Sequence, residues 1–148
     1  MSEQEAATSV HEQLARMVEN GEHATYQALK GLFAELEPTT NEFMFGQWRG
    51  GTFDDRDIGN FYGKRFNSEE HCEPMLRTKE DGTVFAWPDW GEARLREVGY
   101  GGKVQSTVIY DDRPLMDYFR KVNDDLVLGL GDWKGKAKSF FWLARDKK

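Results

Sequence analysis

The chain has 148 residues and a formal net charge of −6, from 20 Lys and Arg against 26 Asp and Glu. This length predicts one domain over residues 1–148, enough to bury about two-thirds of the surface of the unfolded chain. The negative charge argues against nucleic acid as a partner, because a phosphate backbone selects a basic surface. No apolar run reaches the roughly 18 residues of a membrane-spanning helix, so we expect no membrane insertion.

The N-terminus and the cysteine content indicate the compartment. Residues 1–5 are acidic and lack the apolar core of a signal peptide. The single cysteine, Cys72, excludes an internal disulfide and is typical of a reducing environment. We therefore expect a cytoplasmic protein. Aromatic residues make up 14% of the chain, which is enough to fill a core and also to line an apolar pocket.

Residues 1–37 are predicted to form a helical N-terminal segment with two helices. In residues 3–19, apolar side chains recur at helical spacing before a stop at Gly21. In residues 25–36, Thr25 is a candidate N-cap ahead of a second apolar stripe. Such a stripe is typical of ordinary packing, here against a barrel wall or over one mouth. The first helix is more polar, which leaves open a mobile arm or a contact in a homodimer.

Residues 43–53 alternate aromatic residues and glycines without helical spacing, which predicts a strand. Gly46 and Gly50 lie two residues on either side of Trp48, on the same face of that strand. Two missing side chains beside one large ring allow another segment or a ligand to approach the indole. Trp48 is therefore predicted to plug one end of a barrel.

The following connection, residues 54–60, is charged. Its aspartates, among them Asp57, lack the glycine and distal glutamate of a calcium loop, so a solvated loop is favoured. The three histidines stand at no metal-ligand spacing from one another or from the cysteine. Nucleotide-binding and hydrolase motifs are also missing. The sequence thus predicts neither a metal nor a cofactor.

From residue 61 onward, short alternating segments are separated by turn residues. Asp81-Gly82 marks a hairpin. In the turn at residues 87–91, Trp87 and Trp90 either pack on the barrel wall or form a lip over its mouth. We expect about eight antiparallel strands, which suffice to close a small barrel over residues 42–146 of a mainly β protein. After the first, the strands are expected at residues 61–66, 75–79, 83–87, 93–100, 104–110, 115–122, 125–132 and 136–146.

Three segments carry a resemblance to a known family. Gly46-Gln47-Trp48-Arg49-Gly50 resembles the motif that names the GXWXG family, and residues 62–66 are similar to another segment of it. Residues 108–122 resemble the domain of unknown function that follows in these proteins. A looser similarity links Gly-x-Trp near the first strand to lipocalins, fatty-acid-binding proteins and nitrobindins.

The resemblance implies a lipocalin-like barrel with a central pocket, and it does not fix a ligand. It also implies that an arginine of the last strand, here Arg145, stacks on Trp48. Nitrobindins hold haem through a histidine near the end of the chain, and this sequence has none there. His71 would be the sole candidate ligand, so haem is not expected.

Two charged residues share strand faces with aromatic rings. Lys64 alternates with Tyr62 and Phe66, and Asp117 shares its face with Phe119. A buried charge must be paired or must shift its pKa and become neutral. Lys64 and Asp117 are therefore predicted partners inside the barrel. Three arginines alternate with these interior positions and are expected to face outward: Arg49, Arg65 and Arg120. Of these, Arg120 is the first candidate for an exception.

Two roles are open for the predicted pair, with Tyr110 as a third polar group. It is either a structural ion pair that fixes strand register or the polar end of an apolar pocket. In the second case the protein binds an apolar or aromatic small molecule. The ligand-contacting residues would be Trp48, Tyr62, Lys64, Phe66, Tyr110, Asp117 and Phe119.

The same cavity could instead belong to a cofactor-independent isomerase, cyclase, dehydratase or lyase. Asp117 would act as the base, and Lys64 or Tyr110 would stabilise an enolate or alkoxide. The lack of a histidine base weighs against this alternative, so the sequence favours binding and leaves catalysis open. Nothing in the predicted helices goes beyond ordinary amphipathicity, which gives an interaction module the least support.

Overall fold

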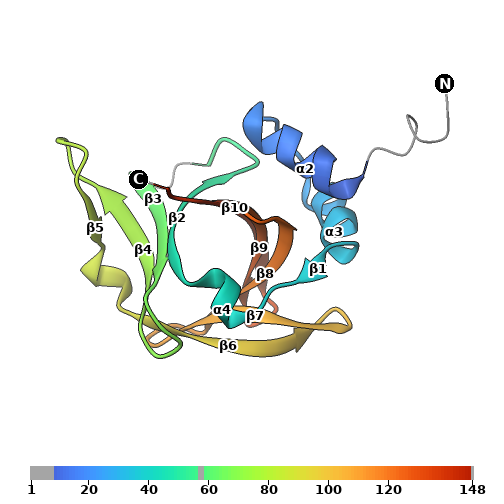
Figure 1. Cartoon of the computed structure of the whole chain (residues 1–148). Helices are drawn as coiled ribbons and strands as arrows, with labels where there is room; N and C mark the ends of the chain where they lie inside the picture. The colour runs from blue at the N-terminus through green and yellow to red at the C-terminus, as the bar shows by residue number, and fades with distance from the viewer. Residues whose placement is uncertain (1–8, 57–58, 148) are drawn as a thin grey trace, which may run out of the picture.

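Eight antiparallel strands close into a barrel in the computed structural model, which describes residues 9–56 and 59–147 (Figure 1). The predicted mainly β barrel with two N-terminal helices is confirmed. Around the barrel the strands follow the order β8-β7-β6-β4-β3-β2-β10-β9, and β9 pairs back with β8. The strands are β2 (Gly46–Thr52), β3 (Phe61–Phe66), β4 (Cys72–Thr78), β6 (Ala93–Tyr100), β7 (Lys103–Tyr110), β8 (Leu115–Asn123), β9 (Leu126–Trp133) and β10 (Ala137–Arg145).

Two short strands extend the barrel sheet. β1 (Glu37–Pro38) pairs with β8, and β5 (Val84–Ala86) pairs with β4 to form the predicted hairpin. The β4–β5 hairpin projects from the barrel at the left of Figure 1. Beside it, β4 and β6 are joined by a single residue pair, Cys72 with Ala93. The barrel wall is therefore least continuous next to this hairpin.

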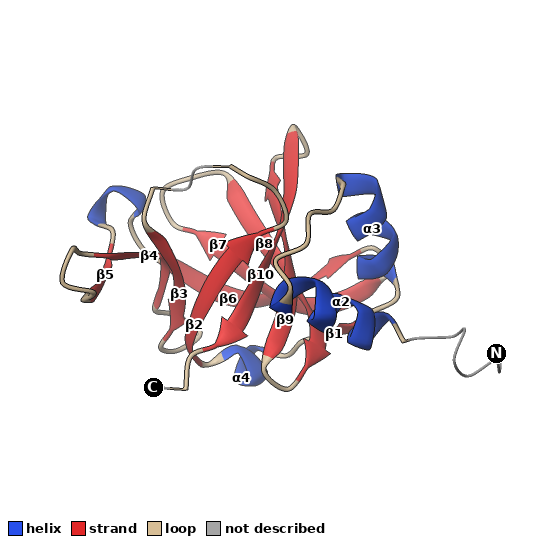
Figure 2. Cartoon of the chain, turned by 90° about the horizontal axis from the view of Figure 1, so that it is seen from above, coloured by secondary structure: helices blue, strands red, loops and turns tan. Residues whose placement is uncertain are grey.

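Two helices cover the outside of the barrel rather than its mouth. α2 (Val10–Glu19) begins after Ser9, and α3 (Tyr26–Ala34) begins after Thr25, whose side chain accepts a hydrogen bond from the backbone N–H of Ala28 at 3.2 Å. The predicted cap at Thr25 is thus confirmed, while residues 3–8 of the first predicted helix lie outside the described residues. Figure 2 shows both helices along one side of the strands. Within the described residues, no helix is long and apolar enough to cross a membrane.

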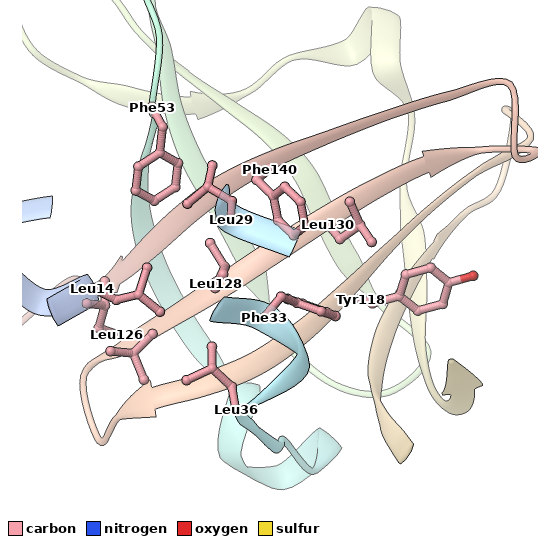
Figure 3. Packing of buried hydrophobic residues seen from close by; sticks show 11 residues of the cluster. Leu14, Leu29, Phe33, Leu36, Phe53, Tyr118, Leu126, Leu128, Leu130 and Phe140 are labelled. Carbon is pink, nitrogen blue, oxygen red and sulfur yellow. The ribbon is translucent and has the colours of Figure 1, made fainter. Parts of the chain in front are cut away.

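The outer core lies between these helices and the barrel wall (Figure 3). Leu29 and Phe33 of α3 pack with Leu128, Leu130 and Phe140 from β9 and β10, all nearly inaccessible to solvent. Burial of each such side chain contributes about 1.5–3 kcal/mol. The helices therefore stabilise the wall from outside and leave the barrel interior to other side chains.

The predicted strand at residues 43–53 begins later in the structure. Its first residues form α4 (Asn41–Met44), where Thr40 caps the helix by accepting from the Phe43 N–H at 3.1 Å. Gly46 then adopts a φ of 122°, a conformation that side-chain-bearing residues rarely take. This turn allows β2 to start directly after the helix.

Candidate functional site

Trp48 fills one end of the barrel interior. Its side chain is fully buried, and its Nε1 donates to the Met44 carbonyl at 2.9 Å. The Arg145 guanidinium lies 4.2 Å from the centre of the indole and donates to the Phe43 carbonyl at 3.0 Å. The predicted stacking of Arg145 on Trp48 is confirmed, and this end of the interior is closed.

The other end of the interior holds a cavity of about 610 Å³. The wall is mostly apolar and includes six aromatic residues: Phe61, Trp87, Trp90, Tyr110, Trp133 and Phe141. Leu115, Met75, Gly59 and Gly131 complete the apolar part, and the polar lining residues are Thr52, Arg56, Lys64, Asp117, Lys138 and Ser139.

Trp87 precedes the short helix η1 (Pro88–Trp90) and Trp90 ends it, directly after the projecting hairpin. Their rings lie 6.3 Å apart, and Trp90 meets the Tyr110 ring edge-on at 6.1 Å. Arg77 stacks on Trp87 at 4.1 Å and Arg113 on Trp90 at 4.0 Å. Both tryptophans therefore pack against neighbouring side chains and also line the cavity. Wall packing and a position at the cavity, predicted as alternatives, occur together.

Two inward-facing glycines of β9 make room inside the barrel, Gly129 for the Phe141 ring and Gly131 for the cavity. A Cβ on Gly129 would lie 2.4 Å from the Phe141 ring, so this ring lies directly against the β9 backbone. A Cβ on Gly131 would lie 3.2 Å from Oδ1 of Asp117. Gly129 therefore accommodates an aromatic ring, whereas the missing side chain of Gly131 leaves space beside Asp117 in the cavity wall.

Lys64, Tyr110 and Asp117 form a buried network at the cavity. Lys64 Nζ lies 3.2 Å from Asp117 Oδ2 and donates to the Tyr110 hydroxyl at 2.9 Å. Tyr110 donates to the same Oδ2 at 2.9 Å. The three residues are 3%, 3% and 2% exposed, so the network is screened from bulk solvent. The predicted contact between Lys64 and Asp117 is present.

Lys64 and Tyr110 interact with groups of the protein itself. Lys64 Nζ donates to the Pro74 carbonyl and to the Tyr110 hydroxyl, each at 2.9 Å, and forms an ion pair with Asp117. Burial raises the pKa of Tyr110 well above its ordinary range, and the Asp117 carboxylate raises it further. Tyr110 therefore keeps its proton, and that proton is bonded to Asp117.

Asp117 Oδ1 is the exception in the network. No donor of the described residues reaches this oxygen, whereas every fully buried polar side-chain atom among them has a partner. Oδ1 is therefore accessible from the cavity that Asp117 lines. A carboxylate oxygen in this position offers an acceptor to a bound molecule.

Three predicted contact residues lie in the filled interior instead. Trp48, Phe66 and Phe119 are buried in one apolar cluster and are not among the cavity-lining residues, so the structure does not place these predicted ligand contacts at the cavity. Phe66 and Phe119 meet edge-on at 5.6 Å. Phe119 in turn contacts Phe141 at 6.1 Å, which places it behind the cavity wall.

Tyr62 also differs from its predicted position. The pairing of β3 with β4 shifts register on both sides of Gly63, which is the signature of a β-bulge. The alternation is displaced, so Phe61 and Lys64 line the cavity while Tyr62 donates to Asp146 outside it. Sequence alternation alone therefore missed Phe61 and misplaced Tyr62.

The three arginines divide as follows. Arg49 stacks on Trp142 at 5.4 Å, and Arg65 pairs with Glu73 at 2.8 Å, both away from the cavity. Arg120 is 1% exposed and donates to the Phe33 and Tyr100 carbonyls at 2.9 and 2.8 Å. It faces away from the barrel interior, yet α3 covers it, so it caps the end of that helix rather than contacting solvent.

Two family models match the chain. One describes a GXWXG protein and covers residues 31–82, and the other describes a domain of unknown function, DUF4334, and covers residues 91–145. A crystal structure of a protein from Thermomonospora curvata is 38% identical, with a TM-score of 0.90 over 95% of this chain and 100% of that chain. The chain belongs to the GXWXG family. No curated protein matches it.

The two matched regions of this GXWXG protein are parts of one barrel. The GXWXG region contributes β2 to β4 and Lys64, whereas the DUF4334 region contributes β6 to β10 with Tyr110 and Asp117. The polar network is therefore assembled across both regions, and neither region forms it alone.

Metal and thiol chemistry find little support in the described part of the chain. It contains no group of three His, Cys, Asp or Glu positioned to hold a metal, and Asp57 lies outside it. His71 pairs with Glu92 at 3.2 Å in an exposed loop and does not line the cavity. Burial raises the pKa of Cys72 to about 12, so this residue remains a thiol packed in the core.

Proposed function

We propose that the protein binds an apolar or aromatic small molecule in the barrel cavity, without covalent chemistry, in the cytoplasm. One observation carries this proposal: a largely apolar cavity of about 610 Å³ includes the polar network of Lys64, Tyr110 and Asp117 in its wall. Small-molecule sites typically occupy about 300–1,000 Å³ and combine apolar walls with a few polar groups that orient the ligand.

The position of the network favours binding over a purely structural ion pair. A pair that only fixes strand register has no need of an adjoining cavity, and the rest of the interior is filled by side chains such as Trp48 and Leu143. Here the network borders the cavity, and Asp117 keeps one oxygen without a protein donor among the described residues. This arrangement supports a role in orienting a bound molecule.

A neutral, environment-sensitive dye, N-phenyl-1-naphthylamine, tests the proposal. We expect one molecule to bind per chain with a blue-shifted emission, and aromatic or terpenoid compounds to displace it. The cavity-filling variant Leu115→Trp should lose the dye while its melting temperature stays close to that of the original protein. Val104→Trp is the matched control, because Val104 is 60% exposed and lies outside the cavity.

Two results would contradict binding in the barrel. The first is a failure of the dye to bind at all. The second is equal binding by Leu115→Trp and Val104→Trp, which would place the dye on the outer surface. Native mass spectrometry of the protein purified from cells would add the mass of any retained ligand.

A proton-transfer enzyme is the second candidate, favoured by the accessible Oδ1 of Asp117. This oxygen could accept a proton from a substrate carbon in an isomerase, cyclase, dehydratase or lyase. However, Lys64 and Tyr110 interact with groups of the protein itself, which weighs against a role for either at a developing oxyanion. We therefore place catalysis second. Incorporation of solvent deuterium into a displacing compound, lost in Asp117→Asn, would reverse this order.

A further inference from the structure

We infer that the cavity recognises a hydroxyl group of its ligand, an alcohol or a phenol, at a notch formed by Asp117, Gly131 and Ser139. The inference rests on the proposed function and specifies the chemical class of the ligand. All three residues line the cavity. They come from three neighbouring strands, because β9 pairs with both β8 and β10.

The register of these strands brings the three residues together. Gly131 is the direct partner of Asp117 across β8–β9 and of Ser139 across β9–β10. The three positions therefore form one row across the wall, with the two polar side chains on either side of the glycine. Because Gly131 has no side chain, the space between Asp117 and Ser139 stays open.

The distances place both polar groups beside the space that the missing side chain of Gly131 leaves. A Cβ on Gly131 would lie 3.2 Å from Asp117 Oδ1 and 3.8 Å from Ser139 Oγ. A ligand hydroxyl that enters this space in van der Waals contact with Gly131 has one polar group on either side, and hydrogen bonds to them would measure about 2.5–3.0 Å. Among the described residues, neither Oδ1 nor Ser139 Oγ has a protein hydrogen-bond partner.

The chemistry of the notch selects a hydroxyl. Its proton would bond to the carboxylate oxygen Oδ1, and its lone pair would accept from the Ser139 hydroxyl. A ketone offers no proton to Asp117, and a carboxylate would place a second negative charge beside it. A ligand ammonium would add a cation next to Lys64, which already lies 3.2 Å from the other oxygen of Asp117.

Matched naphthalene probes test this selection through displacement of N-phenyl-1-naphthylamine. 2-Naphthol, 2-methylnaphthalene and 2-naphthoate share one ring system and differ in a single group. We expect 2-naphthol to bind about tenfold more tightly than 2-methylnaphthalene, since a hydrogen bond to a charged group contributes at least this factor. 2-Naphthoate should bind more weakly than either.

Two variants locate the preference in the notch. Ser139→Ala removes one partner, and Gly131→Ala places a methyl group in the space that the ligand hydroxyl would enter, next to Asp117 Oδ1. Each should reduce the preference for 2-naphthol several-fold and leave 2-methylnaphthalene binding within about twofold. Gly99→Ala is the control, because a Cβ on this strand glycine would meet no atom within 4 Å.

The outcomes separate this inference from the proposed function. Equal binding of 2-naphthol and 2-methylnaphthalene overturns the hydroxyl notch and leaves the apolar cavity intact. A preference that survives in both notch variants also overturns it, because the hydroxyl would then bind elsewhere. If no naphthalene probe binds, the proposed function and the inference both fail.

Discussion

The two ends of the barrel interior contain similar groups in different arrangements. At the closed end, Arg145 lies 4.2 Å from the centre of the Trp48 ring. At the cavity end, Lys64 lies 5.2 Å from the centre of the Phe141 ring. Both ends thus hold a cation against an aromatic ring, yet one is filled and the other encloses about 610 Å³.

The difference comes from the partners of each cation. Arg145 donates to backbone carbonyls and lies 3.7 Å from Oδ1 of Asp125, and Trp48 uses its one donor on Met44, so this end is complete within the protein. Lys64 is held by a carboxylate, and that carboxylate keeps one oxygen toward the cavity. The closed end stabilises the fold, whereas the other end combines burial with an unfilled acceptor.

The largest expected effect is a loss of stability when the closed end is truncated. Trp48→Ala should lower the free energy of unfolding by about 3–5 kcal/mol, because it removes a fully buried indole and leaves a cavity. Denaturant unfolding measures the loss. Trp133→Ala, which truncates a half-buried indole at the cavity, should cost much less. Equal losses would show that the two ends contribute alike to stability.

A double-mutant cycle on Lys64 and Asp117 sharpens the comparison at the cavity end. Lys64→Met or Asp117→Leu alone leaves a buried unpaired charge, which costs about 3–5 kcal/mol when the pair is structural. The double variant should then recover most of that loss.

Dye binding, read on the same variants, decides what the pair is for. Retained binding in the double variant would make the pair scaffolding. Loss of binding with little change in stability would make it part of the site, since functional charges are often strained in the free protein.

The sequence alone placed the features that depend on regular alternation. The strands from residue 61 onward and the facing of Lys64 and Asp117 follow from period two, and the stacking of Arg145 followed from a family resemblance. Alternation failed at Tyr62, because the bulge beside it is set by the register with β4. The strand predicted for residues 43–44 is a helix in the structure, because Thr40 caps its N-terminus.

The cavity-forming residues were harder to find. Gly131 and Ser139 become neighbours of Asp117 only once β8, β9 and β10 are paired in register. A glycine in a strand signals a close approach of some kind but does not name its partner. The polar pair was therefore predictable, whereas the space beside it depends on pairing between strands.

A moderate effect is expected from removing the cation at the closed end. Arg145→Ala should lower the free energy of unfolding by about 0.5–2 kcal/mol through the lost cation–π contact. Its dye affinity should stay unchanged, because Arg145 is not among the cavity-lining residues. A matched loss of dye binding would show that the two ends of the interior are coupled.

The smallest effect is a pH dependence that belongs to the cavity end. Burial and the Asp117 carboxylate raise the pKa of Tyr110 in the folded protein, so the folded state holds its proton at a pH where the unfolded chain has released it. The stabilisation is complete below the unfolded pKa of about 10 and is lost as the pH rises above it. Stability should therefore decline above about pH 10, and less steeply in Tyr110→Phe than in the original protein. Tyr118, whose pKa burial raises to about 12, retains its own contribution in both proteins, so the difference between the two slopes isolates Tyr110. Parallel slopes would mean that Tyr110 ionises equally readily in the folded and unfolded chain. The inference that Tyr110 keeps its proton within the buried network would then be wrong.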